Sequence, residues 1–349
     1  MGYRLNEKIR NLKPYDPIQG RYPIRLDANE SFLRPSGELL SKIGDAMAGL
    51  AFNRYPDPFA RELCGSFAGY YGVDAADVTA GNGSDELISV IENAFLMRGE
   101  PVVTLSPDFA MYRFYSSLDE TKCVEYRKKP DFSVDLDELI GLTNESGARL
   151  LIFSNPCNPT GGGIGREDMR RLVRSVGALV VVDEAYMDFW DQSLLGEAGE
   201  YDNLIVLRTL SKAFGMAAVR LGFAVANPSL TNALRAVKSP YNVNACTQKI
   251  GSVLLQEHER ARSCIAQIRA SQRELFAALQ RLERANPRKL TVYDSVANFT
   301  YARFAECDRI FETLLKAGIV VRHLGGCLRI TAGTPAENGA LIRRLEEIL

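Results

Sequence analysis

Histidine is scarce in this sequence: only His258 and His323 occur among 349 residues. A Ser–His–Asp triad, a histidine-rich metal centre or a histidine general base is therefore hard to assemble from the chain. His258 lies in a charged stretch typical of a solvated helix face. His323 lies near an arginine and two glycines and could stand at the mouth of a site. If the chain is an enzyme, we expect its acid–base group to be a lysine.

Cysteine pairs, excess charge and long apolar runs are also missing. The seven cysteines are odd in number and widely spaced, with no Cys-x-x-Cys pair, which argues against a disulfide framework or a zinc site. The net charge of −1 gives no general attraction to nucleic acid or anionic lipid. No apolar run approaches the roughly 20 residues that span a bilayer, and residues 1–10 lack a signal-peptide core. We expect a cytoplasmic protein without metal, nucleic-acid or membrane partners.

The middle of the chain alternates apolar runs with amphipathic segments, a pattern typical of a mainly parallel sheet covered by helices. Helical spacing of apolar residues follows Ser84 and Gly165. The run Leu-Val-Val-Val at 179–182 is apolar at every position, as expected where helices cover both faces of a sheet. The predicted strands are 101–105, 149–154, 178–183, 203–208 and 222–226.

The pattern changes after about residue 240. A long helix is predicted from about 258 to 283, followed by shorter helices and four strand-like runs at 290–293, 298–304, 319–322 and 328–331. A chain of 349 residues exceeds one compact core of ordinary size, so we predict two domains. The predicted parts are a proline-rich extended arm over 1–35, a large α/β domain over 36–240, and a smaller α+β domain over 241–349 that packs with part of the arm.

Unusual polar residues follow the predicted strands at their carboxyl ends, where doubly wound sheets bind ligands. Each motif alone has an ordinary interpretation, as a turn, a helix cap or a surface charge. Their joint position at successive strand ends favours one common crevice. The motifs are Gly81-Asn-Gly-Ser84 before a helix, Asn158-Pro-Thr-Gly161, Asp183-Glu-Ala-Tyr186 and Ser211-Lys212.

These motifs, followed by Arg220, resemble the fold-type I aminotransferases, which use pyridoxal 5′-phosphate. A closer resemblance, to the histidinol-phosphate aminotransferases, covers nearly the whole chain. It implies an α/β fold with a mainly parallel central sheet in a large domain plus a smaller α+β domain. It also implies a homodimer that exchanges an amino group between histidinol phosphate and 2-oxoglutarate in histidine biosynthesis. The blocks that carry it are 26–30, 54–58, 81–86, 208–214, 240–244 and 328–334.

The chemistry of the cofactor ring and the resemblance imply the same roles for the residues around it. Lys212 would form the Schiff base and carry the proton during transfer, which needs an amine that is not permanently protonated. Asp183 would pair with the protonated pyridine nitrogen. Asn158 and Tyr186 would hydrogen-bond the ring's 3′-oxygen, and Phe109 would stack on the ring face.

The cofactor phosphate is expected at the start of the helix after Gly83, where backbone amides and the helix dipole favour an anion. Asp85 follows in the first turn and would repel the phosphate if it pointed inward, so we expect it to point away. The resemblance implies that Tyr55 reaches the phosphate from the neighbouring subunit. The residues expected to hold the phosphate are Gly83 and Ser84, in the helix motif that also contains Asp85, together with Ser211 and Arg220.

Substrate recognition is implied by the resemblance alone. Arg329 would bind the anionic end of the substrate with Arg322 as its helper, and Tyr15 and Asn29 would close over the substrate. One pocket with bidentate arginine could serve both a carboxylate and a phosphate. Cys157 stands where the family often has asparagine.

Three alternatives remain open at this point. A threonine-phosphate decarboxylase shares the style of Ala80-Gly-Asn-Gly83, Phe109-Ala110 and Val243-Asn-Ala245, although the lysine block is more like an aminotransferase. A broad aromatic amino acid aminotransferase would use the same cofactor residues. A non-catalytic regulator that binds the cofactor would need a DNA-binding domain, for which the short arm leaves no room.

Overall fold

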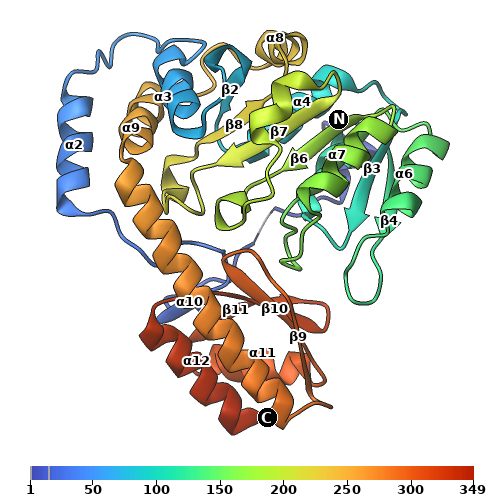
Figure 1. The fold of residues 1–349 in the computed structure, drawn as a ribbon, viewed down its shortest axis with the longest axis vertical. Helices are drawn as coiled ribbons and strands as arrows, with labels where there is room; N and C mark the ends of the chain where they lie inside the picture. The colour runs from blue at the N-terminus through green and yellow to red at the C-terminus, as the bar shows by residue number, and fades with distance from the viewer. Residues whose placement is uncertain (1, 15) are drawn as a thin grey trace.

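A computed structural model describes residues 2–14 and 16–349, which build two separate sheets (Figure 1). The larger sheet has seven strands in the order β2-β8-β7-β6-β5-β3-β4. Its pairs are parallel except those that β8 makes with β2 and β7. The five predicted strands of this sheet, which are β3, β5, β6, β7 and β8, are confirmed within one residue at each end, whereas β2 and β4 are not among the predicted strands. The strands are β2 Val78–Gly81, β3 Pro101–Ser106, β4 Lys122–Arg127, β5 Leu150–Ser154, β6 Leu179–Asp183, β7 Leu204–Thr209 and β8 Gly222–Val225.

Helices cover both faces of this sheet, and the alternation of side chains along β6 shows it. Val180 and Val182 pack into one core cluster, whereas Val181 packs into another on the opposite face. The first cluster includes residues of α2, α3, α6, α7 and α9, and the second includes residues of α4, α5 and α8. These helices are α2 Gly37–Ala48, α3 Arg61–Tyr71, α4 Ser84–Phe95, α5 Ala110–Leu118, α6 Leu136–Glu145, α7 Arg166–Ser175, α8 Pro228–Val237 and α9 Ala245–Gln256.

The smaller sheet has five strands in the order β1-β11-β12-β10-β9 and forms a second core with three helices. In Figure 1 the long helix α10 runs from the larger sheet down to the smaller one. The strands are β1 Ile24–Leu26, β9 Leu290–Tyr293, β10 Phe299–Phe304, β11 Ile319–Leu324 and β12 Cys327–Thr331; the helices are α10 His258–Ala285, α11 Cys307–Lys316 and α12 Pro335–Ile348. Short 3₁₀ turns complete the fold: η1 Ala75–Asp77, η2 Met187–Phe189, η3 Leu195–Glu200 and η4 Ala217–Val219.

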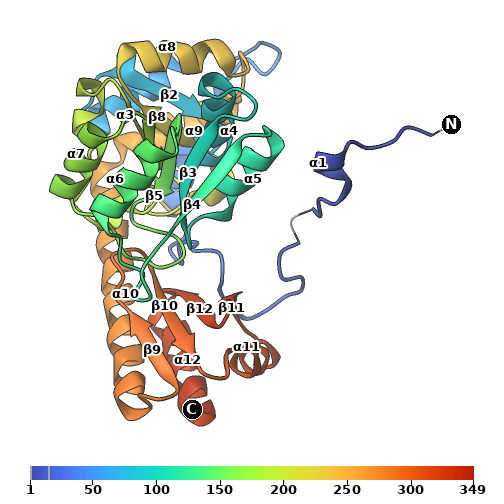
Figure 2. The same ribbon diagram turned by 90° about the vertical axis from the view of Figure 1, so that its right-hand side faces the viewer.

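The amino-terminal arm is more structured than its prolines indicate. A short helix, α1 Glu7–Arg10, forms because the Asn6 side chain accepts the backbone N–H of Ile9 at its start. Figure 2 shows this segment to one side of both sheets, and Lys8 donates a hydrogen bond of 2.7 Å to the Leu118 carbonyl at the end of α5. Further along, β1 joins the smaller sheet as a parallel partner of β11.

Helix α9 packs against α2 and α3, beside the larger sheet. The boundary expected at residue 240 would place this helix in the smaller domain, apart from its packing partners. Its contacts therefore favour a boundary within α10, which is the element that connects the two cores. The strand ends expected to carry the chemistry all belong to the larger sheet, where Asp183 pairs in register with Ser154 of β5 and Leu207 of β7.

Candidate active site

The loop after β7 brings Lys212 against the arm and the loop after β6. Its Nζ donates a hydrogen bond of 3.1 Å to the carbonyl oxygen of Ala28 and lies 5.9 Å from the centroid of the Tyr186 ring. The Tyr186 hydroxyl accepts a hydrogen bond of 2.8 Å from the side-chain amide of Asn29. Three segments far apart in the sequence thus meet around one amino group.

Asp183 ends β6, three residues before Tyr186, and is buried. Its side chain is 4% exposed, and its two oxygens accept hydrogen bonds from the Tyr112 hydroxyl at 2.9 Å and the Ala185 amide at 3.1 Å. Burial raises the pKa of Asp183 to about 7, although both hydrogen bonds act in the opposite direction. A carboxyl group in this setting suits a cationic partner that arrives with a ligand, since pairing would offset the cost of burying its charge. Tyr112 was not anticipated, but it lies one helical turn after Phe109.

A cradle for an anion forms where α4 begins. No described side chain caps this helix start, so its first amides are available to a ligand. Gly83 has φ +83°, and a Cβ there would lie 2.7 Å from Nη2 of Arg220. Glycine is therefore needed both for the backbone conformation and for the close approach of the guanidinium. Arg220 Nη1 also donates a hydrogen bond of 3.4 Å to the buried hydroxyl of Ser211, so four of the expected phosphate residues come together, Ser84 included.

The expectation that Asp85 points away from this cradle is wrong. Its Oδ2 lies 4.0 Å from Nη2 of Arg220. Burial raises the pKa of Asp85, while the charges of Arg220 and Lys212 act to lower it. The reason is helical phase: Asp85 precedes the buried Ile88 by three residues and therefore faces the same side of α4.

Three of the expected substrate residues, Arg329, Arg322 and Asn29, lie where the smaller sheet meets the arm. Arg329 donates from Nη1 to the Asn158 side-chain oxygen and from Nη2 to the Asp27 carbonyl at 2.6 Å. Arg322 is its cross-strand neighbour in the register of β11 and β12. Asn29 is buried with φ 54°, and its side-chain oxygen accepts a hydrogen bond of 3.0 Å from the Thr331 hydroxyl. These contacts link the arm, the larger domain and the smaller domain around one group of polar side chains.

Phe109 and Tyr55, two further expected residues, make contacts with other aromatic rings. Phe109 begins α5 with its ring centroid 5.6 Å from that of Tyr112. Tyr55 is 80% exposed and stacks on Tyr241 at 4.5 Å between centroids, at the surface rather than in the crevice. Tyr15 lies outside the described residues.

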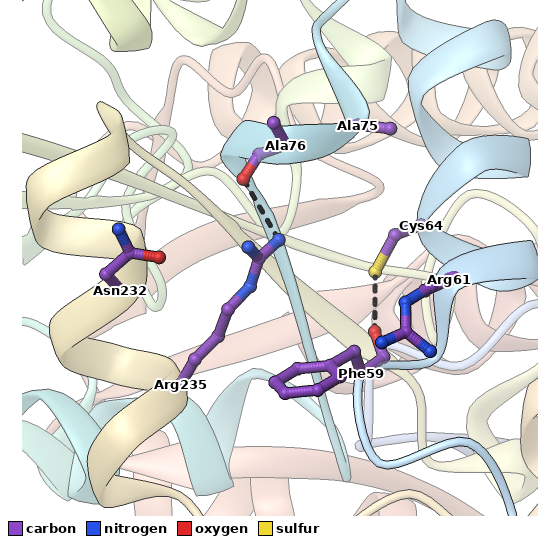
Figure 3. A pocket seen from close by; sticks show the side chains of 7 residues that line it. All are labelled: Phe59, Arg61, Cys64, Ala75, Ala76, Asn232 and Arg235. Carbon is purple, nitrogen blue, oxygen red and sulfur yellow. Dashed lines mark hydrogen bonds between the residues drawn. The ribbon is translucent and has the colours of Figure 1, made fainter.

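The structure also contains cavities. One of about 540 Å³ is lined by residues of α3, η1 and α8 (Figure 3), where Arg235 donates a hydrogen bond of 2.9 Å to the Ala76 carbonyl. Another, of about 520 Å³, lies beside Lys128 and Cys157. Within residues 2–14 and 16–349, no cluster of side chains suited to a metal ion occurs and no helix is long and apolar enough to cross a membrane. The crevice is therefore distinguished by its polar groups, not by cavity size.

Comparisons with known proteins agree with this geometry. The family described as aminotransferase class I and II matches residues 23–345. The histidinol-phosphate aminotransferase of Clostridium novyi is 40% identical, covering 95% of this chain and 93% of the relative, and that of Clostridium kluyveri is 36% identical, covering 98% of both.

Solved structures show the same fold. A histidinol-phosphate aminotransferase from Sinorhizobium meliloti, solved with pyridoxal-5′-phosphate, superimposes with a TM-score of 0.88 at 23% identity, covering 99% of this chain and 97% of the other. The L-threonine-O-3-phosphate decarboxylase of Porphyromonas gingivalis superimposes with a TM-score of 0.80 at 22% identity, covering 93% and 99%. The predicted fold class is confirmed, and the fold alone does not separate a transferase from a lyase.

Proposed function

Because the chain belongs to the class I and II aminotransferase family, we propose that it is a histidinol-phosphate transaminase of histidine biosynthesis, with 2-oxoglutarate as amino acceptor. The observation that carries this proposal is the meeting of Lys212, Tyr186 and the arm in the loop after β7, together with the buried carboxyl group of Asp183 at the end of the neighbouring strand β6. Relatives of this name at 36–40% identity over nearly the full length support the substrate assignment.

Pyridoxal 5′-phosphate is the cofactor of this transaminase, and the residues present fit it. The buried carboxyl group of Asp183 would hold the proton of the ring nitrogen, and the amides at the start of α4 would hold the phosphate together with Ser211 and Arg220. When bound, the cofactor supplies an electron-accepting ring that stabilises negative charge at the substrate carbon bearing the amino group. Phe109 would cover one face of that ring.

Lys212 is proposed to attach the cofactor and then to take and return the proton at the substrate's amino-bearing carbon. Its amino group donates a hydrogen bond to the Ala28 carbonyl and lies 5.9 Å from the centroid of the Tyr186 ring, at the end of a flexible side chain that can turn between these tasks. The hydroxyl of Tyr186 and the amide of Asn158 would orient the ring oxygen beside the reacting atoms. Asn29 keeps the Tyr186 hydroxyl in place through its hydrogen bond of 2.8 Å.

Arg329 and Arg322 are proposed to bind the anionic end of each substrate. Both arginines stand on neighbouring strands at one register position, which suits a shared anion. The same pair would accept the phosphate of histidinol phosphate and the distal carboxylate of 2-oxoglutarate in turn. Asn29 and Tyr15 are proposed to close this end of the crevice.

We further propose that the enzyme is a cytoplasmic homodimer in which Tyr55 contacts the phosphate bound by the other subunit. The exposed stack of Tyr55 on Tyr241 supports this, since it leaves two aromatic rings open to solvent in a single chain. A hybrid of Tyr55→Ala and Lys212→Ala subunits tests it: each hybrid dimer would contain one intact site. Regained activity on mixing the two inactive variants is expected, and its absence would contradict a shared site.

The substrate is tested with a panel of amino donors. Purified protein should transfer the amino group of histidinol phosphate to 2-oxoglutarate far faster than that of phenylalanine or tyrosine. Threonine phosphate should release no CO₂. Preferential use of the aromatic amino acids would replace the proposed substrate, and CO₂ release from threonine phosphate would replace the proposed reaction with a decarboxylation.

A further inference from the structure

A buried polar group lies just behind the strand ends that form the crevice. The side chains of Lys128 and Asp108 are only 3% and 1% exposed, with Nζ 3.8 Å from Oδ2. Lys128 also donates a hydrogen bond of 2.8 Å to the sulfur of Cys157, which is itself buried. The Ser154 hydroxyl donates a hydrogen bond to Asp108. Lysine and aspartate are almost never buried so completely unless they are paired.

Two members of this group, Asp108 and Ser154, accept hydrogen bonds from residues that the cofactor would touch. Asp108 accepts the backbone N–H of Phe109 at 2.7 Å. The Ser154 hydroxyl accepts the backbone N–H of Asn158 at 3.0 Å. Because one carboxylate holds both the start of α5 and the turn after β5, the spacing between Phe109 and Asn158 depends on it.

The charge of Lys128 keeps this arrangement intact. Burial raises the pKa of Asp108, and the Lys128 ammonium acts against that rise. Without Lys128, the buried carboxylate would be left uncompensated and would take up a proton. A protonated Asp108 would donate from one oxygen, so it could no longer accept all the hydrogen bonds that now reach it.

We propose that Asp108, Lys128 and Cys157 are positioning residues that set the places of Phe109 and Asn158 against the cofactor ring. This inference rests on the proposed function, because it assigns these residues to the same site. Cys157 belongs to it because its sulfur takes the hydrogen bond of Lys128 and because it directly precedes Asn158 in the turn. An apolar trio would fill the space without fixing the direction of any of these hydrogen bonds.

The test compares Lys128→Met with Lys129→Met. Lys129 is the next residue, but its side chain is 47% exposed and pairs with Asp135 at the surface. Lys128→Met should weaken pyridoxal phosphate binding about ten-fold in a spectroscopic titration and change the pH midpoint of the bound cofactor's absorption. It should also lower kcat by about a hundred-fold with little change in KM, the cost of a small misplacement of reacting groups. Lys129→Met should change none of these quantities.

Cys157→Ala and Cys157→Ser keep the inference testable if Lys128→Met does not fold. A serine hydroxyl can still accept from Lys128 and alanine cannot, so the serine variant should keep tighter cofactor binding and a higher kcat. The inference would be overturned if Lys128→Met lowered the thermal midpoint but left cofactor affinity, absorption and kcat unchanged. It would also be overturned if the two Cys157 variants had equal cofactor affinity and equal kcat. If the wild-type protein bound the cofactor but transferred no amino group, the proposed function would be refuted. The cofactor absorption of Lys128→Met, compared with that of wild type, would still test whether these residues position Phe109 and Asn158.

Discussion

Asp183 should make the cofactor-free protein less stable as the pH rises, and Asp183→Asn should remove this effect. In the folded chain the pKa of Asp183 is raised from 3.8 to about 7, mainly by burial. The folded protein therefore holds this proton more tightly than the unfolded chain does. The group favours folding below pH 3.8, and its contribution is lost progressively as the pH rises to about 7, above which the loss is complete.

The size of the effect follows from the shift. A difference of about 3 pKa units, at roughly 1.4 kcal/mol per unit, corresponds to a penalty of about 4 kcal/mol above neutral pH. At pH 5 only a part of that penalty applies, roughly 1.5 kcal/mol. An asparagine in place of Asp183 bears no charge and can still accept one of the two hydrogen bonds. Relative to wild type, the variant should therefore gain about 2 to 3 kcal/mol more stability at pH 8.5 than at pH 5.

Urea unfolding of the two cofactor-free proteins at both pH values measures this difference, because the free energy of unfolding varies linearly with denaturant. The same variant should lose at least about a hundred-fold in turnover when loaded with cofactor, since the ring nitrogen would lack its electrostatic partner. A stability gap that stays constant or narrows from pH 5 to pH 8.5 would refute the reasoning about burial. A gap of the expected size with normal turnover would show that Asp183 is buried but does not serve the ring.

Other changes test the remaining parts of the site. Gly83→Ala forces a Cβ against Arg220 at a positive φ and should weaken cofactor binding in a spectroscopic titration. Inorganic phosphate should raise the thermal midpoint of the cofactor-free wild type but not that of this variant. Arg208→Met leaves the buried carboxylate of Glu184, now 3.0 Å from the guanidinium, without its partner, and should lower the free energy of unfolding by about 3 to 5 kcal/mol in urea titrations. Arg329→Lys keeps the charge but removes the fork that binds an anion at two points, so KM for both substrates should rise while cofactor absorption stays unchanged.

The sequence predicts five of the seven strands of the larger sheet because these strands are largely buried on both faces and therefore read as apolar runs, whereas the edge strand β4 is mostly part-exposed and carries charged residues. The Leu-Val-Val-Val run of β6 has no polar interruption that could be mistaken for a helix or a loop. By contrast β1 is only three residues long, and its pairing with β11 depends on a partner at the far end of the chain. The packing of α9 on α2 and α3 is likewise set by tertiary contacts, which local spacing does not record.

For the site, motif reading finds the residues that follow strands and misses those that support them from other elements. Tyr112 reaches Asp183 from the first turn of α5, and Lys128 reaches Cys157 from the loop after β4, where it reads as one of two adjacent lysines. The orientation of Asp85 differs from the prediction for another reason: the repulsion expected between its carboxylate and a phosphate is weaker than the constraint of helical phase. Helical phase prevails since the burial of Ile88 and Ile91 fixes which side of α4 faces inward before any charge is placed. Without a bound phosphate, the Asp85 carboxylate offsets the charge of the Arg220 guanidinium. A phosphate bound to Arg220 should therefore replace the contact between Asp85 and Arg220.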